Sequence, residues 1–220
     1  MILNHILALD NHSSTMPSKA ISLDSGRYIA VCRLGEGSLG PVLAVKDTSA
    51  SSDQTRFLVV KCVAKQSPKS HALITLALSL EARVSDHSAV LGHTGVFDGG
   101  SYHGIVSDLC QSGTLLEAIH LRLFHYFDPR PVGIIPQLAD AMNFCHKQGV
   151  YNVDLSPHNI FLSGDPTSII RLSDFTMATS DKKRRGMFGR AEYMAPGMLP
   201  FLSFIPDDSL DCRGYRRKIV

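Results

Sequence analysis

Three glycines, Gly35, Gly37 and Gly40, lie between two segments rich in aliphatic residues. Glycines at this spacing let a backbone approach phosphate groups closely, because no Cβ atom stands in the way. The segment after them, Pro41 to Val45, continues as a strand and does not open a helix. The glycines are therefore predicted to form a hairpin over a ligand, whereas a dinucleotide-binding fold needs a helix at this point. A chance glycine turn is the alternative for this motif taken alone.

Lys61 lies within an apolar segment, Phe57 to Val63, that is predicted to be a strand. A lysine buried in such a segment needs an anionic partner. Glu81 lies at the end of an apolar, helix-like segment and is the candidate partner. An ion pair between the two would hold Lys61 against the phosphates of a ligand. An outward-facing lysine and a surface glutamate are the alternatives.

Two segments in the second half of the chain carry oxygen ligands and a possible base. Asp154 and Asn159 flank a short loop that contains Pro157. In this arrangement an aspartate can orient an attacking hydroxyl while the asparagine holds a metal ion. Asp174 follows the apolar strand Ile169 to Leu172, and its carboxylate suits Mg²⁺, which prefers carboxylate and phosphate oxygens. Either motif can occur by chance, so their order along the chain carries the argument.

The elements expected to position these residues are strands in the first half and helices in the second. This order predicts an α+β fold in two lobes, with a hinge near Asp108 to Gly113. Strands are predicted at Tyr28 to Arg33, Pro41 to Lys46, Phe57 to Val63, Val90 to Phe97 and His103 to Ser107. Helices are predicted at Ala72 to Val84, at Leu115 to Phe124, and along an apolar stripe of Ile135, Leu138, Met142 and Cys145 that ends before Gly149.

The composition is that of a globular chain of 220 residues, with 44% hydrophobic and 19% charged residues. A net charge of +2 argues against nucleic acid or an acidic membrane surface as a partner. The 5 cysteines contain no C-x-x-C pair, which argues against a zinc site and favours a reducing compartment. The longest apolar segment, Ala72 to Leu80, is far shorter than the roughly 20 residues that cross a bilayer. We therefore expect a cytoplasmic protein without a membrane partner.

Taken together and in this order, the motifs resemble those of eukaryotic protein kinases, from about Tyr28 to about Pro200. The segment Glu192 to Pro196, Glu-Tyr-Met-Ala-Pro, resembles the serine/threonine type. The resemblance implies a small β-rich N-lobe with one helix at 27–107 and a mainly helical, partial C-lobe at 108–206. A flexible leader at 1–26 and a divergent polar tail at 207–220 complete the expected division. The helices that end the C-lobe in this family have no counterpart in the sequence, which suggests a chain truncated at its C-terminal end.

The resemblance also implies ATP and Mg²⁺ as cofactors and a protein serine or threonine hydroxyl as the phosphate acceptor. It implies that Asp154 is the catalytic base, that Asn159 and Asp174 bind Mg²⁺, and that Glu81 pairs with Lys61. The residues that it places around ATP are Leu34, Gly35, Gly37, Gly40 and Val42 in the glycine-rich hairpin, Lys61 at the α- and β-phosphates, and Asp108 to Cys110 at the adenine.

Several positions depart from the family pattern. Asn152-Val153 replaces the usual His-Arg, and Gly197 replaces a glutamate. Ser156 replaces a lysine that neutralises the transferring phosphate, and Arg190 is hypothesised to supply a substitute cation. Thr176 replaces the glycine after Asp-Phe. These changes favour the alternative of a pseudokinase that binds nucleotide or a protein without catalysis, and the short C-terminal region favours a fragment that does not fold stably.

Overall fold

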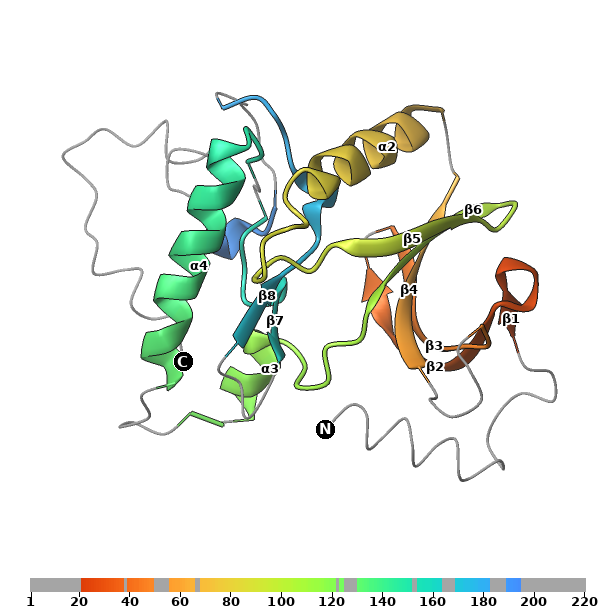
Figure 1. The fold of residues 1–220 in the computed structure, drawn as a ribbon, viewed down its shortest axis with the longest axis horizontal. Helices are drawn as coiled ribbons and strands as arrows, with labels where there is room; N and C mark the ends of the chain where they lie inside the picture. The colour runs from red at the N-terminus through yellow and green to blue at the C-terminus, as the bar shows by residue number, and fades with distance from the viewer. Residues whose placement is uncertain are drawn as a thin grey trace.

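The computed structural model describes residues 21–37, 39–49, 56–65, 68–121, 123–124, 130–151, 154–163, 169–182 and 189–194. These residues form two lobes (Figure 1), one built on a curled antiparallel sheet and one built on helices with a short two-stranded sheet. The expected α+β, two-lobed architecture is thereby confirmed.

The N-terminal lobe is a six-stranded sheet in the order β1-β2-β3-β4-β6-β5, with antiparallel neighbours throughout. Its central strand β4 alternates between two environments, because successive side chains of a strand point to opposite faces. Leu58, Val60 and Cys62 are buried on one face, which places Lys61 on the other. The elements of this lobe are β1 (Ser22–Leu23), the 3₁₀ turn η1 (Asp24–Gly26), β2 (Tyr28–Gly37), β3 (Gly40–Asp47), β4 (Arg56–Ala64), α2 (Pro68–Ala82), β5 (His93–Asp98) and β6 (Tyr102–Asp108).

The glycine-rich segment is a hairpin between β2 and β3. Gly35 pairs with Val42 and Gly37 pairs with Gly40, so the chain returns as a strand and not as a helix, as predicted. Gly40 has a φ of 141°, and a Cβ atom built there would collide with the carbonyl oxygen of Cys62 on β4. Glycine is required at this position because of the close approach of two backbones.

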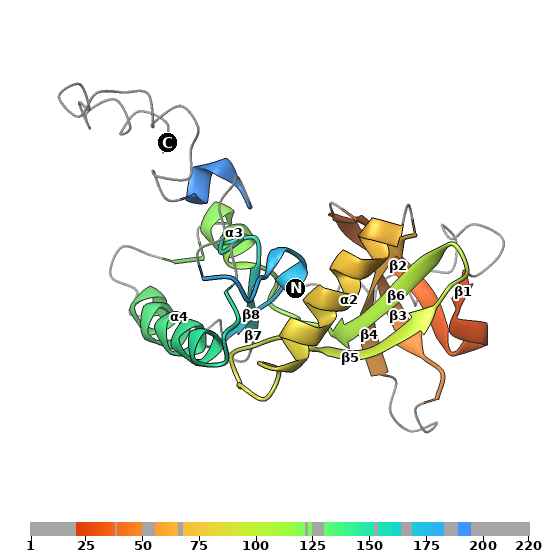
Figure 2. The ribbon, with the colours of Figure 1, turned by 90° about the horizontal axis from the view of Figure 1, so that it is seen from above.

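Helix α2 lies across the junction of the two lobes, beside β5 and above the turn η2 (Phe175–Met177) (Figures 1 and 2). Ile74, Ala77 and Leu80 recur at a spacing of three residues and are buried, whereas Leu76 is 47% exposed. The segment predicted as a buried helix is therefore buried along one face only. Leu80 packs into the core of the C-terminal lobe, so the end of α2 is fastened to that lobe.

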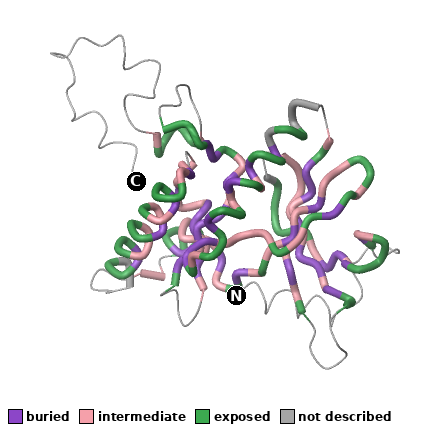
Figure 3. Tube along the Cα trace, turned by 45° about the horizontal axis from the view of Figure 1, so that its top comes forward, coloured by how far each residue is buried: buried purple, intermediate pink, exposed green. Residues whose placement is uncertain are grey.

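The C-terminal lobe packs its helices against a short sheet of β7 and β8. Its core contains Leu162, Leu172 and Phe175, all with side chains that are 0% exposed, and the tube in Figure 3 shows buried segments in both lobes. Thr114 begins α3 with a capping box, in which its hydroxyl and Glu117 satisfy each other's backbone N–H groups. The elements of this lobe are α3 (Leu115–His120), α4 (Arg130–Lys147), β7 (Ile160–Ser163), β8 (Ile169–Leu172), η2 and η3 (Ala191–Tyr193).

The structure differs from the sequence predictions at several elements. The leader expected at 1–26 ends earlier, because β1 pairs with β2 and buries Leu23 against the N-terminal core. On α4, Leu138, Met142 and Cys145 of the predicted stripe pack in the C-terminal core, as expected, but Ile135 is 66% exposed and its neighbour Ile134 is buried instead. Strand β5 begins at His93 and not at Val90, which instead forms an isolated parallel bridge with Leu172.

None of the helices in the described ranges has both the length and the apolar character needed to cross a membrane.

Candidate active site

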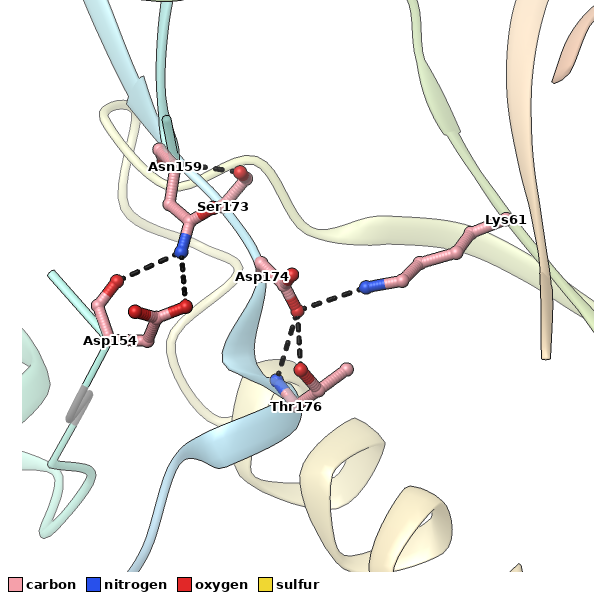
Figure 4. A network of polar contacts seen from close by, with 6 residues as sticks. All are labelled: Lys61, Asp154, Asn159, Ser173, Asp174 and Thr176. Carbon is pink, nitrogen blue, oxygen red and sulfur yellow. Dashed lines mark hydrogen bonds and ion pairs between the residues drawn. The ribbon is translucent and has the colours of Figure 1, made fainter. Parts of the chain in front are cut away.

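The loop that carries Asp154 is held by a hydrogen bond across its own base (Figure 4). Asn159 Nδ2 donates to Asp154 Oδ2 at 2.9 Å and to the Asp154 carbonyl oxygen at 2.8 Å. The Asn159 carbonyl oxygen in turn accepts from the backbone N–H of Ser173 at 2.9 Å and from its hydroxyl at 3.1 Å. Asn159 and Ser173 are buried, so the loop and the end of β8 are fixed to each other.

Asp174 follows β8 directly and has a left-handed backbone conformation, with φ 58° and ψ 73°. Its Oδ1 accepts from the Thr176 hydroxyl at 2.6 Å and from the Thr176 backbone N–H at 3.3 Å. An aspartate tolerates this conformation because its short side chain bonds to the backbone just ahead. Burial raises the pKa of Asp174, but the Lys61 ammonium and the hydrogen bonds from Thr176 lower it more, so the pKa lies below its ordinary value.

Lys61 reaches across the junction from β4 to the same carboxylate, as Figure 4 shows. Its Nζ lies 3.0 Å from Asp174 Oδ1, and the two side chains are 18% and 28% exposed. Val42 lies opposite Lys61 in the β3–β4 register, which places the base of the glycine-rich hairpin beside the lysine. The structure thus brings residues of both lobes, predicted from separate motifs, to one place.

The predicted ion pair between Lys61 and Glu81 is not what the structure contains. Glu81 Oε1 accepts from the backbone N–H of His93 at 2.6 Å and from its Nδ1 at 2.8 Å. Lys61 is bound to Asp174 instead. Leu80, the neighbour of Glu81 on α2, packs in the C-terminal core, and α2 contacts β5, which begins at His93; the end of α2 is therefore held beside His93.

His93 was not recognised from the sequence, although it begins β5, the strand against which α2 packs. The hydrogen bond to Glu81 raises the pKa of His93, while burial acts in the opposite direction and is the weaker influence. A histidine near an acidic residue of a preceding helix is too common a pattern to have marked it in advance.

The other predicted nucleotide-binding residues belong to the glycine-rich hairpin and to the hinge between the lobes. A Cβ atom at Gly35 would meet nothing within 4 Å, so this glycine is not required for packing and leaves open space. Leu34 is 37% exposed on the same strand. At the hinge, the Asp108 side chain turns outward to Arg56, with Oδ1 3.0 Å from Nη2, whereas Cys110 is buried. Burial raises the pKa of the Cys110 thiol to about 11.

Arg190 lies close to the loop of Asp154. Its backbone N–H donates to Asp154 Oδ1 at 3.1 Å. The Arg190 charge also contributes, after burial, to a lowered pKa of His158. Ser156 Oγ and His158 Nδ1 are buried without a hydrogen-bond partner among the described residues. The Arg190 backbone therefore lies beside the loop in which Ser156 replaces lysine, and the role of its side chain as a substitute cation stays a prediction. Asn152, Val153, Gly197 and the 207–220 tail lie outside the described residues.

The oxygen atoms at this site suit a magnesium ion bound with phosphates. No described residue donates a recorded hydrogen bond to Asp174 Oδ2 or Asn159 Oδ1. Within the described ranges, no three acidic, histidine or cysteine side chains gather as a cage of protein ligands. Mg²⁺ is commonly held by one or two protein oxygens together with substrate phosphates, and the residues present fit that arrangement.

Comparison with known proteins shows what this chain is similar to. The profile of the protein kinase domain matches residues 28–209. Calcium-dependent protein kinase 4 of Plasmodium berghei (strain Anka) is 28% identical over 178 residues, covering 79% of this chain and 33% of that protein. Serine/threonine-protein kinase PEPKR2 of Arabidopsis thaliana is 25% identical, covering 84% of this chain and 38% of that protein.

Calcium/calmodulin-dependent serine/threonine-protein kinase 1 of Oryza sativa subsp. japonica is 26% identical over 230 residues, covering 89% of this chain and 37% of that protein. The chain spans between 33% and 38% of the length of these three relatives. Because the kinase domain profile covers most of the chain, this protein belongs to the protein kinase family.

Proposed function

We propose that this chain binds Mg·ATP at the junction of its lobes and transfers the γ-phosphate to a serine or threonine hydroxyl of a protein substrate. The observation that carries the proposal is the convergence of Asp154, Asn159 and Asp174 in one hydrogen-bonded region that Lys61 reaches from the opposite lobe. Phosphoryl transfer depends mainly on positioning and on charge stabilisation, and this region supplies fixed groups for both.

Each residue has a defined task in this proposal. Asp154 accepts the proton of the attacking hydroxyl, the role of general base that a positioned carboxylate can fill. Asn159 Oδ1 and Asp174 Oδ2 are the proposed ligands of Mg²⁺. When bound, Mg²⁺ would neutralise negative charge on the phosphate oxygens. Lys61 then leaves Asp174 for the α- and β-phosphates.

The remaining binding groups come from the N-terminal lobe and the hinge. Gly35, Gly37 and Gly40 are proposed to cover the phosphates, and the open space at Gly35 supports this role. Leu34 and Val42 are proposed to contact the nucleotide from the side of the N-terminal lobe. The Asp108–Cys110 backbone is proposed to contact the adenine. This segment suits backbone recognition because the Asp108 side chain turns away to Arg56 and the Cys110 side chain is buried.

A cytoplasmic location also belongs to the proposal. Cys32, Cys62, Cys110 and Cys145, the cysteines in the described part of the chain, are free thiols, as a reducing compartment would keep them.

Binding without transfer is the second candidate function, and a specific observation favours it. The catalytic carboxylate, Asp154, already accepts hydrogen bonds from Asn159 and from the Arg190 backbone, one on each oxygen. In addition, Lys61 and Glu81 have other partners. A pseudokinase with this arrangement would hold nucleotide or a protein partner without turnover.

Thermal unfolding with and without Mg·ATP tests the common part of both functions. At 100 times its Kd, the ligand should stabilise a folded binder by roughly 2.7 kcal/mol, and Lys61→Met should remove this gain. Transfer of labelled γ-phosphate to a mixture of serine- and threonine-containing peptides then separates the two candidates. Transfer that disappears in Asp154→Asn, with nucleotide binding retained, supports the kinase; binding with no transfer by the unmodified chain supports the pseudokinase. A chain that Mg·ATP does not stabilise contradicts both.

A further inference from the structure

The two residues expected to form an ion pair at the nucleotide site are each held by another residue. Glu81 Oε1 accepts two hydrogen bonds from His93, one from the backbone and one from the ring, at 2.6 and 2.8 Å. The side chains of Glu81 and His93 are 13% and 20% exposed, so the contact is largely shielded from water. Lys61 is bound to Asp174.

We infer that His93 is a positioning residue that holds Glu81 away from Lys61 and thereby weakens nucleotide binding. This inference rests on the proposed function, because it concerns the lysine that is proposed to bind the phosphates. His93 touches neither the phosphates nor the reacting hydroxyl in the proposal and acts only through Glu81.

The N-terminal sheet carries the two residues, Lys61 and His93, that compete for Glu81 in this inference. Lys61 lies on β4, His93 lies on the edge strand β5, and β6 runs between these strands. In β6, Ile105 is the register partner of Lys61 and Ser107 is the partner of His93. The donors of His93 and of Lys61 therefore lie on two separate strands, and in this inference Glu81 accepts from one or from the other.

Charge strengthens the contact with His93. Glu81 raises the pKa of His93 against the opposing effect of burial, and no other described charged group contributes to that change. A hydrogen bond between an imidazolium and a carboxylate is stronger than one from a neutral imidazole. Glu81 is consequently released more readily as the pH rises, and nucleotide binding should tighten in the same direction.

Replacement of His93 by leucine removes the ring donor while it keeps the backbone donor and an apolar side chain. We expect His93→Leu to lower the Kd for Mg·ADP by roughly threefold to tenfold, the effect of redirecting about one charge-assisted hydrogen bond. In a Glu81→Gln background the same replacement should have no effect on Kd. His87→Leu is the matched control, because it removes a histidine that faces Asp140 at 3.2 Å, away from Lys61.

The pH profile separates positioning from a general effect on the fold. In the unmodified chain the Kd should fall as the pH rises through the pKa of His93, and this fall should be absent in His93→Leu. His93→Gln, which keeps a neutral donor, should also lose the pH dependence and serves if the leucine variant fails to fold. A folded variant whose Kd and pH profile match those of the unmodified chain overturns the inference.

A measurement without nucleotide keeps this outcome distinct from failure of the proposed function. A zero-length carbodiimide joins a lysine to a carboxylate in contact with it, and peptide mass spectrometry identifies the pair. We expect a Lys61–Asp174 link in the unmodified chain and a new Lys61–Glu81 link in His93→Leu. If neither chain binds nucleotide but the new link forms, the proposed function fails and with it the effect on nucleotide binding, while the positioning of Glu81 by His93 stands; if only Lys61–Asp174 links form in both chains, the positioning role fails.

Discussion

Thr176 Oγ1 donates a 2.6 Å hydrogen bond to Asp174 Oδ1, the same oxygen that accepts from Lys61. The backbone N–H of Thr176 is a third donor to this atom. A carboxylate oxygen has two lone pairs, so Oδ1 is saturated and Oδ2 is left as the oxygen for a cation. Threonine at this position therefore adds a hydroxyl donor to Oδ1 beside the backbone donor that a glycine would also supply, and so restricts the proposed binding of a metal ion by Asp174.

Removal of this hydroxyl should strengthen metal binding. We predict that Thr176→Val increases the Mg²⁺-dependent part of ADP affinity by about threefold to tenfold, because one hydrogen bond no longer competes for Asp174. Thr176→Ser keeps the hydroxyl and is the matched control. Titration calorimetry with ADP, in the presence and absence of Mg²⁺, measures the difference. Equal Mg²⁺ dependence in the valine and serine variants would count against the role assigned to Thr176.

The contact between His93 and Glu81 predicts a pH-dependent contribution to the free energy of unfolding. The pKa of His93 is raised on folding, chiefly by its hydrogen bond to Glu81. The stabilisation is therefore complete below the unfolded pKa of about 6.5 and is lost as the pH rises through the folded value. Each unit of pKa difference corresponds to about 1.4 kcal/mol.

Urea unfolding at a series of pH values, compared between the unmodified chain and His93→Gln, isolates this contribution from other titrating groups. We expect the difference in free energy of unfolding to be largest in mild acid and to shrink above neutrality. A difference that is constant with pH would show that His93 contributes through packing alone.

Two glycines of one hairpin should respond differently to the same substitution. Gly40→Ala forces a Cβ atom against the Cys62 carbonyl and requires an unfavourable φ, so it should lower the free energy of unfolding by roughly 1–3 kcal/mol. The Cβ atom of Gly35→Ala would meet nothing within 4 Å, so this substitution should change the free energy of unfolding by no more than about 0.5 kcal/mol. Gly35→Ala should instead weaken Mg·ATP binding, and chemical unfolding together with a nucleotide titration measures both effects.

Much of the fold followed from the sequence because strands and apolar segments are local signals. The turn from Gly37 to Gly40 and the strand around Lys61 depend on neighbouring residues only, and both were found. On α4 the predicted stripe was wrong at Ile135 alone, because Ile134 and Ile135 are chemically identical neighbours and only tertiary packing decides which one is buried. Strand β7 was not predicted because no candidate site residue follows it directly, whereas Asp174 drew attention to the equally short β8.

At the candidate site, the sequence indicated which residues lie close together. It was less informative about which pairs of atoms form hydrogen bonds. The contacts of Asp154 with Asn159 lie within one loop, so their spacing constrained them. The partner of Glu81 depends on tertiary packing, because α2, β4 and β5 are separate elements, and in the structure that partner is His93 and not Lys61. Spacing along a chain carries no information about such a displacement.

Phe175 provides a test of how α2 is held. Its side chain is 0% exposed and belongs to the same core as Leu80 of α2. Phe175→Leu should lower the free energy of unfolding by roughly 1–3 kcal/mol, because a smaller side chain leaves space in the core. Leu76→Ala, on the exposed face of α2, is the control and should change it by no more than about 0.5 kcal/mol. Equal effects in urea unfolding would contradict the assigned packing of α2.

The buried thiol at the hinge has a consequence for inhibitor chemistry. Electrophilic warheads such as acrylamides and chloroacetamides react with thiolates and not with thiols. Burial raises the pKa of Cys110 to about 11. At neutral pH only about one molecule in ten thousand would carry the thiolate. A covalent compound directed at Cys110 should therefore behave as a reversible ligand, and its selectivity must come from the shape of the hinge and not from bond formation.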